Sequence, residues 1–342
     1  MEKYSLISVV ILNYNGKGIV EPCLASVLNS NYPNFEVVLV DNASCDGSIE
    51  IIEKTFGNND KLKIVKNNKN LFYAEGNNIG IDNARGEYIF ILNNDTEIDK
   101  NCLKEIAEAM KDESIGAGQP KILVYGQSSI IDNTGGIIDR YGYTKGRGSQ
   151  ELDVGQYDNL RQIFYAGGTA MVLKRNVLNE IGIFDPEFVA HWEDVDLSWR
   201  IRLRGYKIIF IPQACLYHKI SKTIKRFGNY HRISFYIRKN RIAGLIKNYA
   251  FCNLIKTLPI LILIYFLMFI KELNVDKDVK LALSSIWAII WNIKELPYIL
   301  RARWRVQRKI RRISDSQILN FMQSGFIVFQ AMCLYMGKKC NA

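Results

Sequence analysis

The chain has 342 residues, of which 48% are apolar and 23% charged, a composition that is typical of a folded protein and excludes a disordered one. Its net charge of +11 is unevenly divided: residues 1–218 hold 22 Lys and Arg against 29 Asp and Glu, whereas residues 219–342 hold 23 against 5. The seven cysteines are scattered and form no CxxC pair, which argues against a disulfide framework or a zinc site and favours a reducing compartment.

The first 120 residues alternate short β-branched runs with stretches of helical length. The runs are 7–12, 35–40, 62–65 and 88–92, and the stretches are roughly 18–30, 47–56 and 74–84. Near-continuous apolar strands separated by helices predict a parallel sheet that is covered on both faces. The apolar run that starts at Leu6 is too short for a signal-peptide core and follows no basic segment, so we assign it to the first strand.

Polar clusters follow three of these strands. They are Asn13-Tyr14-Asn15-Gly16, Asp41-Asn42-Ala43-Ser44 and Asn93-Asn94-Asp95-Thr96. Because ligands of such sheets lie beyond the carboxyl ends of the strands, we expect the three clusters to converge on one crevice. A carboxylate at Asp41 can accept the N3–H of uracil or thymine, and one at Asp95 can hold Mg²⁺ or Mn²⁺. Each also has a structural alternative, since Asp41 could cap the next helix and Asp95 could belong to a turn.

Residues 125–165 predict loops and short strands, and a strand with the close-approach pair Gly167-Gly168 follows over 164–173. Helices are expected near 174–182 and 193–204, and each stops at a glycine. The second helix begins with Trp192-Glu193-Asp194-Val195-Asp196. Acids in a first turn suit the helix dipole, but a partly desolvated carboxylate there could also act as a base. His218 ends a strand expected over 208–217, where a lone histidine is more often structural.

The composition changes after His218. Residues 219–256 hold ten Lys or Arg and no acid, and 257–270 hold no charge. Fourteen uncharged residues are short for a membrane span, which favours a re-entrant or in-plane element. Nucleic acid is disfavoured as a partner, because the basic stretches lie beside long apolar ones.

A second basic cluster, 301–312, holds seven Lys or Arg among twelve residues. The apolar residues around it share one helical face; they are Ile299, Val306, Ile310 and Ile313. Basic residues on the rest of this helix would bind anionic lipid. The alternative is that the apolar face packs on the body of the protein or on a partner subunit.

Taken in order, five motifs between Ser8 and His218 resemble the family 2 inverting glycosyltransferases of the GT-A fold. The motifs are Val9 to Asn15, Val40 to Ser48, Asn70 with Ala74-Glu75-Gly76-Asn77-Asn78, Leu92 to Thr96, and Glu193 to Arg200. The resemblance implies an α/β GT-A catalytic domain over residues 1–220, with a mostly parallel central sheet. A basic, helical, membrane-associated region would then occupy 221–342.

The resemblance also implies a role for individual residues. Asp194 matches the general base, and Asp95 and His218 match ligands of Mg²⁺ or Mn²⁺. The donor nucleotide would be bound by Asn13, Asn15, Asp41, Asn77, Asn78 and Asn94. Gly167, Gly168, Trp192 and Glu193 would line the acceptor side of the active site. Two departures from the family pattern are the single acid in Asn93-Asn94-Asp95 and the pair Phe72-Tyr73, where many relatives have Gly-Phe.

The implied reaction moves a sugar from a UDP- or dTDP-sugar to a hydroxyl of a lipid-linked or polysaccharide acceptor in cell-surface glycan synthesis. The Asn-Asn-Asp-Thr form and the basic tail look most like the rhamnosyltransferase-type subgroup, which implies rhamnose or another deoxysugar. We expect the protein on the cytoplasmic face of the cell membrane, bound to anionic lipid, with a homo-oligomer left open. The alternatives are a non-catalytic nucleotide-sugar-binding scaffold and a sugar nucleotidyltransferase.

Overall fold

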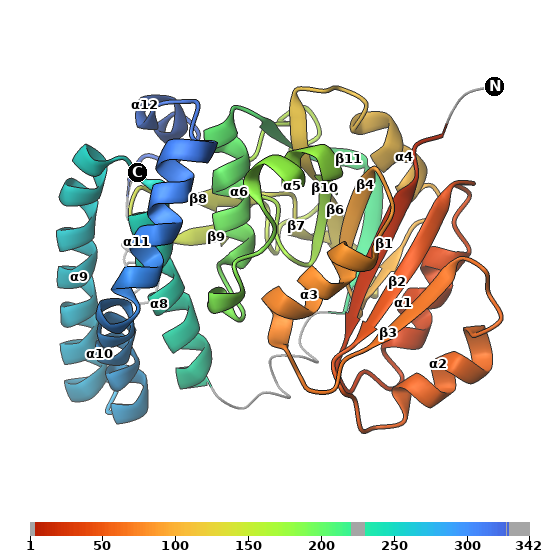
Figure 1. Cartoon of the computed structure of the whole chain (residues 1–342), viewed down its shortest axis with the longest axis horizontal. Coiled ribbons are helices and arrows are strands. Elements are labelled where there is room, and N and C mark those ends of the chain that lie inside the picture. Colours follow the sequence, from red (N-terminus) through yellow and green to blue (C-terminus); the bar gives the residue numbers. More distant parts are fainter. Residues whose placement is uncertain (1–3, 220–229, 326, 328–342) are drawn as a thin grey trace.

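The computed structural model describes residues 4–219, 230–325 and 327 and is built around a nine-stranded sheet (Figure 1). The strands of this sheet are β1 (Ile7–Asn13), β2 (Phe35–Asp41), β3 (Leu62–Lys66), β4 (Tyr88–Asn93), β5 (Thr96–Ile98), β6 (Ile115–Val124), β7 (Gln127–Asn133), β10 (Ala170–Lys174) and β11 (Lys207–His218). Their order is β3-β2-β1-β4-β10-β6-β11-β5, with β7 beside β6. A separate hairpin pairs β8 (Gly136–Ile138) with β9 (Thr144–Gly146).

The main sheet is mixed but mostly parallel. Strands β3, β2, β1 and β4 are parallel neighbours, and β10 runs antiparallel to both β4 and β6. Because β11 is parallel to β6, six strands share one direction, and β5, β7 and β10 run the other way. The predicted fold class, an α/β architecture with a mostly parallel sheet, is therefore confirmed.

Strand β6 and helix α4 (Cys102–Ala109) are among the elements that were not predicted, and one strand was predicted too long. Strand β6 contains Gly116, Gly118 and Pro120, which weaken strand propensity, yet it lies near the middle of the sheet. The helix at 102–109 also escaped prediction. The strand predicted over 164–173 begins at Ala170, because its amide bonds back to the Gly167 carbonyl at 3.2 Å and closes a turn.

Helices cover both faces of the sheet. They are α1 (Val20–Leu28), α2 (Ser48–Phe56), α3 (Phe72–Asn83), α4 (Cys102–Ala109), α5 (Arg175–Ile181), the 3-10 turn η1 (Pro186–Phe188), α6 (Glu193–Arg204), α8 (Tyr230–Asn248), α9 (Phe251–Asn274), α10 (Val279–Lys294), α11 (Leu296–Arg305), the π-helical turn η2 (Val306–Ile310) and α12 (Asp315–Leu319). Successive residues of β1 enter different cores: Val9 packs with α1, α2 and α4, and Val10 packs with α3, α5, α6 and α8. The sheet is thus buried on both sides, as its apolar strands predict.

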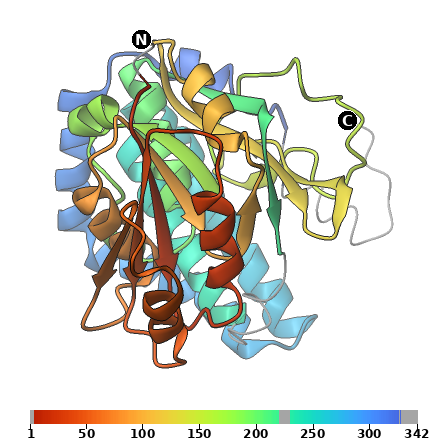
Figure 2. The same ribbon diagram turned by 90° about the vertical axis from the view of Figure 1, so that its right-hand side faces the viewer.

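The C-terminal helices pack on the α6 side of the sheet. In Figure 2 the N-terminal strands, α1 and α2 face the viewer and these helices lie behind them. Buried residues of α8, such as Leu245, share one core with Ile299, Val306 and Ile310. The apolar face of 299–310 therefore packs on the protein itself, the second of the two alternatives considered above. The predicted domain boundary between residues 220 and 221 lies outside the described residues.

Helix α9 is longer than the fourteen uncharged residues that predicted it. It runs for 24 residues, about 36 Å at 1.5 Å per residue, because Lys256 and Lys271 lie on the helix and do not end it. Leu261 and Tyr265 are fully buried, so one face of α9 packs on the protein. Among the described residues, α9 is the one helix long and apolar enough to cross a membrane, judged by length and composition alone.

Part of the basic tail is internal. Four cations of α8 are buried: Arg238, Lys239, Arg241 and Lys247. Arg303 of α11 donates to the Tyr249 carbonyl at 2.6 Å, and Arg311 donates to a carboxylate oxygen of Asp315 at 2.7 Å. These cations hold the C-terminal helices together and are not available to a lipid surface. The charge pattern of the sequence did not distinguish them from exposed ones.

Candidate active site

The three polar strand ends meet in one hydrogen-bonded network. The parallel register places Asn13 of β1 opposite Asp41 of β2, and β4 follows on the other side. Asn13 Nδ2 donates to Asp41 Oδ1 at 3.3 Å and to the Ser48 hydroxyl at 3.0 Å. Asn94 Nδ2 in turn donates to Asn13 Oδ1 at 3.0 Å. The convergence expected from the sequence is therefore present in the structure.

Ser44 links the first two clusters. Its hydroxyl donates to Asp41 Oδ1 at 2.5 Å and accepts from the Asn15 amide at 2.9 Å. Asn15 has φ of 51°, a left-handed conformation that asparagine tolerates, and its Oδ1 accepts from the Cys45 amide at 2.8 Å. Asp41 also accepts from the Ser44 amide at 3.1 Å, so it shapes the loop before α2 as well as the strand-end cluster.

Asp95 and His218 lie together at the ends of neighbouring strand segments. His218 Nε2 is 3.3 Å from Asp95 Oδ1, and His218 Nδ1 is 2.8 Å from Asp132 Oδ2. Burial lowers the pKa of His218, but its bonds to the Asp132 and Asp95 carboxylates outweigh this and raise the pKa to about 9. The two carboxylates, one at each ring nitrogen, thus favour the protonated form of the imidazole.

The same arrangement fits a divalent cation. Two ligands of one Mg²⁺ lie about 3 Å apart when each is about 2.1 Å from the metal at a right angle, close to the separation of Asp95 and His218. Asp132 would then fix the ring through its other nitrogen, as carboxylates commonly do for metal-bound histidine. Within the described residues, no three His, Cys, Asp or Glu side chains form a metal-binding group. The remaining ligands would be water and diphosphate oxygens, which Mg²⁺ commonly keeps.

Asp194 lies at the first turn of α6 and is partly exposed. Its Oδ2 accepts from the Gly168 amide at 2.9 Å, and its Oδ1 accepts from the Val195 amide at 2.8 Å. Burial raises the pKa of Asp194 despite these bonds. The Gly168 carbonyl accepts from the Tyr73 hydroxyl at 2.6 Å, so Tyr73 connects α3 with this turn.

Glu193 differs from its neighbour. It is 5% exposed, and among the described residues its Oε2 has no hydrogen-bond partner. Burial and the adjacent Asp194 charge raise the pKa of Glu193 well above its usual range. Of the two acids, Asp194 is the more accessible and better hydrogen-bonded, so Glu193 holds the proton when the pair carries one charge.

The loop before Asp194 has a strained backbone. Val189 has φ of 62°, rare for a β-branched residue, and the Ala190 amide bonds to the Phe188 carbonyl across it at 2.6 Å, which makes a γ-turn. His191 and Trp192 also have positive φ, at 64° and 72°. Such strain persists when surrounding contacts enforce it.

Those contacts come from α3, whose Tyr73 and Ala74 amides donate to the Val189 carbonyl at 3.1 and 3.0 Å, and from α8. Asn240 Nδ2 lies within hydrogen-bond distance of the Phe188, Ala190 and His191 carbonyls, at 2.8, 3.0 and 2.6 Å. The Trp192 indole donates to the Gly142 carbonyl at 3.1 Å and packs so closely on Gly244 that a β-carbon there would collide with the ring. Trp192, predicted to line the acceptor side, is thus a buried support of the site.

Asn77 and Asn78 both point into the protein from α3. Asn78 donates to the Phe184 carbonyl at 3.0 Å and accepts from the Phe184 amide at 3.1 Å, which ties α3 to the segment before η1. Asn77 donates to the Tyr73 carbonyl at 2.9 Å. The structure therefore gives this pair packing contacts, and does not join it to the network of Asn13 and Asp41.

The Gly167-Gly168 turn connects Asp194 with the polar cluster at the end of β4. The Gly167 amide donates to Gln119 Oε1 at 2.7 Å, and a β-carbon on Gly168 would lie 2.7 Å from the Tyr73 hydroxyl oxygen. The next residue, Thr169, accepts from the Asn93 amide at 3.0 Å. A continuous path thus runs from Asp194 through this turn to the Asn94-Asp95 pair. Sequence reasoning missed Asp132, Gln119 and Asn240, which belong to no motif.

Residues 8–182 match the family model described as Glycosyl transferase family 2, which is more than half of the chain. The chain belongs to that family. It is a glycosyltransferase by family, which argues against the nucleotidyltransferase alternative. Among curated relatives, a poly-beta-1,6-N-acetyl-D-glucosamine synthase of Staphylococcus epidermidis is 30% identical over 225 residues, or 64% of this chain and 51% of that protein. The chain spans about half the length of the curated relatives it matches.

Solved structures of glycosyltransferases share the fold of this family 2 enzyme. TarS 1–349 of S. aureus in complex with UDP has a TM-score of 0.55 at 18% identity, covering 98% of this chain and 93% of that one. The mannosyltransferase PcManGT of Pyrobaculum calidifontis, bound to GDP-Man and Mn²⁺, has a TM-score of 0.54 at 16% identity, covering 85% and 88%. At these identities the likeness concerns the GT-A fold alone.

Proposed function

We propose that this glycosyltransferase inverts the anomeric centre of its donor while moving a sugar from a UDP- or dTDP-sugar to a hydroxyl of a lipid-linked or polysaccharide acceptor. The observation that carries the proposal is the connected path from Asp41 through Asn13 to Asn94, then from its neighbour Asn93 to Thr169 and through the Gly168 turn to Asp194. It brings a candidate base-recognition carboxylate, the Asn94-Asp95 pair and a candidate general base to one edge of the sheet.

In the proposed reaction, the acceptor hydroxyl attacks the anomeric carbon from the face opposite the diphosphate. Asp194 takes the hydroxyl proton as the new glycosidic bond forms, and the bond to the diphosphate oxygen breaks with its electron pair leaving on that oxygen. The raised pKa of Asp194, caused by burial, suits a group that must accept a proton near neutral pH. Mg²⁺ or Mn²⁺ held by Asp95 and His218 would neutralise the charge that develops on the departing nucleotide.

For the sugar we propose rhamnose or another deoxysugar, on the basis of the Asn93-Asn94-Asp95-Thr96 motif. The curated relatives are named for a polymer of N-acetylglucosamine, which makes UDP-N-acetylglucosamine the competing donor. Uracil and thymine each carry an N3–H, so a UDP- or dTDP-linked donor of either sugar is compatible with recognition by Asp41.

Nucleotide recognition is tested by thermal shift with UDP, dTDP, GDP and CDP, each with and without Mn²⁺, followed by the sugar nucleotides. UDP and dTDP should stabilise the protein by about 2.7 kcal/mol at a hundredfold excess over Kd, and CDP by much less. Asp41→Asn should abolish the preference for UDP over CDP, while Asp60→Asn at an exposed loop should not. Equal stabilisation by all four nucleotides would contradict the proposal.

We further propose that the C-terminal helices hold the enzyme on the cytoplasmic face of the cell membrane. The outward faces of α9, α10 and α11 expose large apolar side chains, namely Ile255, Leu263, Phe266, Leu267, Trp287, Ile293, Leu300 and Trp304. Exposed cations lie on the same helices and on η2; they are Lys256, Lys294, Arg301, Arg305, Arg308 and Lys309. Since the opposite face of α9 packs on the protein, we place α9 in the plane of the interface.

Point substitutions test this placement better than deletion, because removing the residues after Asn248 would also remove Ile299 and Val306 from the core. Phe266→Ser with Leu267→Ser should reduce sedimentation with phosphatidylglycerol vesicles. Leu160→Ser, at an exposed position of the catalytic region, is the matched control. Each exposed cation removed should weaken binding by about 1 kcal/mol at low salt. Unchanged sedimentation of the double variant would contradict the placement.

A further inference from the structure

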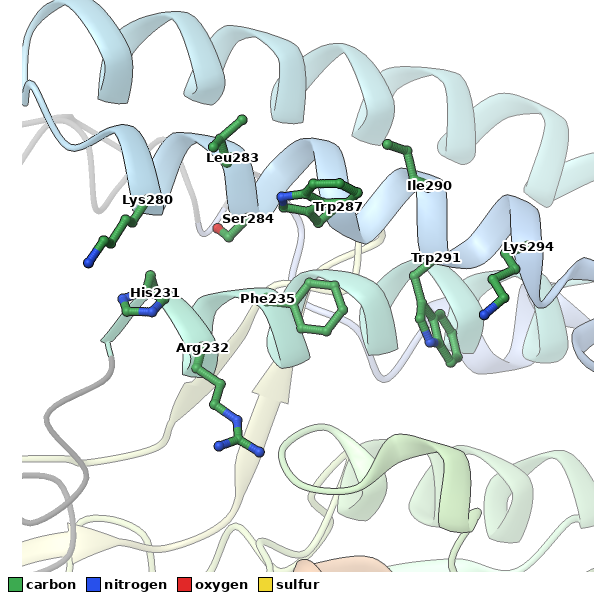
Figure 3. A pocket seen from close by; sticks show the side chains of 10 residues that line it. All are labelled: His231, Arg232, Phe235, Lys280, Leu283, Ser284, Trp287, Ile290, Trp291 and Lys294. Carbon is green, nitrogen blue, oxygen red and sulfur yellow. The ribbon is translucent and has the colours of Figure 1, made fainter.

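A groove of about 570 Å³ lies between the start of α8 and the length of α10 (Figure 3). Its volume falls within the range of sites that bind small molecules. The side chains that line it are His231, Arg232, Phe235, Lys280, Leu283, Ser284, Trp287, Ile290, Trp291 and Lys294. None of them belongs to the motifs that resemble family 2, so the active site does not account for the groove.

The lining is amphipathic. Figure 3 shows Phe235, Trp287 and Ile290 along the middle, with His231, Arg232 and Lys280 toward one end and Lys294 toward the other. Trp287 is 55% exposed, a large fraction for a tryptophan with no functional demand on it. The described residues that line the groove include no acid. Such a surface is complementary to a molecule with an apolar body and an anionic end.

The walls are held in place by contacts behind them. Ser284 accepts from Arg238 at 2.7 Å, and Arg238 forms a buried ion pair with Glu272 of α9 at 2.5 Å. Further along the same two helices, the Lys239 ammonium of α8 lies 3.7 Å from the centre of the Trp291 ring of α10 and donates to the Glu187 carbonyl at 2.6 Å. These contacts join α8 to α10 behind the groove, and the α8 wall is attached to the segment that leads into Asp194.

The groove lies between the membrane-facing helices and the donor side of the active site. The Arg232 guanidinium is 5.5 Å from the centre of the Phe72 ring. Phe72 begins α3, and its carbonyl accepts from Asn42, the neighbour of Asp41, at 3.0 Å. On the other side, Trp287 and Ile290 are part of the exposed apolar surface of α9 and α10. The cationic end of the groove thus lies toward the active site.

We propose that this groove binds one lipid phosphate, the carrier of the acceptor. Its hydrocarbon chain would lie along Phe235, Trp287 and Ile290, and its phosphate would be bound by His231, Arg232 and Lys280. The inference rests on the proposed function in one respect, that the acceptor is lipid-linked. A concave site with three basic side chains at one end suits a single phosphorylated chain better than the flat surface of a bilayer does.

The test uses the full-length protein with farnesyl monophosphate and with farnesol, each in neutral detergent, and binding is measured by titration calorimetry. Wild type should bind the phosphate about 10-fold more tightly than the alcohol, the ratio expected for charge-assisted hydrogen bonds. Arg232→Ala and Lys280→Ala should each remove most of that preference and leave farnesol binding unchanged. Trp287→Ala should weaken binding of both ligands by about 10-fold.

Arg308→Ala and Trp304→Ala are matched controls, since both side chains are exposed on the C-terminal helices outside the groove. Equal affinity for phosphate and alcohol in wild type would overturn the proposal. So would Arg232→Ala weakening adsorption to phosphatidylglycerol vesicles as much as farnesyl phosphate binding, since the groove would then be a general membrane contact. A Trp287→Ala variant with altered oligomeric state and unaltered lipid binding would assign the groove to a second copy, and would also overturn it.

Thermal shift with UDP and Mn²⁺ separates this inference from the proposed function. Groove variants that lose farnesyl phosphate and retain the UDP shift support a lipid-phosphate site apart from the donor site. If wild type shows no nucleotide shift but binds farnesyl phosphate as described, the proposed donor fails and the groove assignment stands. If nucleotide binding and sugar transfer are intact but the lipid ligands are not distinguished, the groove assignment alone fails.

Discussion

The proposed donor side, around Asp41, and the proposed base side, around Asp194, are built from different kinds of contact. On the donor side, Asn13, Asp41, Ser44 and Asn94 bond to one another within a few residues of three strand ends. On the base side, the loop that leads into Asp194 is held by Asn240, about fifty residues further along the chain. The first side follows from the sheet and its motifs, whereas the second depends on a distant helix.

The contrast extends to the buried charges around α6. Lys247 of α8 lies 2.5 Å from Asp185 and 3.1 Å from Asp196, two residues after Asp194. Asn248 donates to the same Asp196 at 2.9 Å. The family match ends at residue 182, before any of these groups. The C-terminal helices are therefore part of the framework of the base side, in addition to any role at a membrane.

The largest expected effect tests the base itself. Asp194→Asn keeps the shape of the side chain but cannot accept the acceptor proton, so kcat/KM should fall by about a thousandfold. UDP binding should be unchanged, because the donor network does not include Asp194. Glu187→Gln, at a nearby exposed acid, is the control and should retain activity. Transfer at wild-type rate by Asp194→Asn would remove this residue from the mechanism.

Asn240→Leu tests whether the base side depends on α8. The variant removes the donor shared by three carbonyls, which should relax the strained loop and lower kcat about 100-fold, the effect of a misplacement near 1 Å. Greater access of water should also lower the raised pKa of Asp194, so the acid limb of the pH–rate profile should move to lower pH.

The matched control is Asn274→Leu. Asn274 is an exposed asparagine of α9 that donates to the Ile270 carbonyl of its own helix. It should leave the rate and the pH profile unchanged. A fall in the melting temperature of Asn240→Leu with an unmoved acid limb would mean that α8 stabilises the fold without placing the base, and the contrast between the two sides would fail.

Most of the fold could be predicted from sequence because its strands are short runs of β-branched residues with helices between them. Strand β6 could not be predicted, because Gly116, Gly118 and Pro120 have low strand propensity. Its pairing with β10 and β11 places it in the sheet. The length of α9 was also missed, because charged residues interrupt its apolar run without ending the helix.

The residues of the candidate site also fall into those that the sequence predicted and those that it did not. Asp41, Asp95 and Asp194 lie in motifs that a single sequence displays. Asp132, the partner of His218, lies 86 residues before it on β7 and has no pattern around it. The inward orientation of Asn77 and Asn78 is equally hidden, since it depends on how α3 meets the segment of Phe184. Motifs in a single sequence do not identify side chains whose role depends on a partner far away in the chain.

Asp132→Asn measures the contribution of such a distant partner. If His218 is a metal ligand, loss of the Asp132 carboxylate should weaken Mn²⁺ binding in the presence of UDP by about 10-fold. Titration calorimetry with Mn²⁺ measures this directly, and Asp60→Asn at an exposed loop is the control. Full activity of wild type in EDTA, or unchanged Mn²⁺ affinity in Asp132→Asn, would give Asp95 and His218 another role.

The smallest expected effect concerns stability on the base side. Burial raises the pKa of Glu193 in the folded protein, so the unfolded chain releases this proton at a lower pH than the folded one does. The folded state therefore loses stability as pH rises from the usual range of a glutamate toward the raised pKa, by up to about 1.4 kcal/mol for each pH unit of that interval. Glu193→Gln removes the titrating group and keeps a similar shape.

Glu193→Gln should accordingly be more stable than wild type at pH 8, by about 1 kcal/mol or more, and the gain should shrink toward pH 5. Thermal melts across this range measure it, with Glu187→Gln as the exposed control. A gain that does not depend on pH would mean that Glu193 is not protonated in the folded protein. Asp194 would then lie beside a second full negative charge, and repulsion between the two charges, not burial, would be the cause of the raised pKa of Asp194.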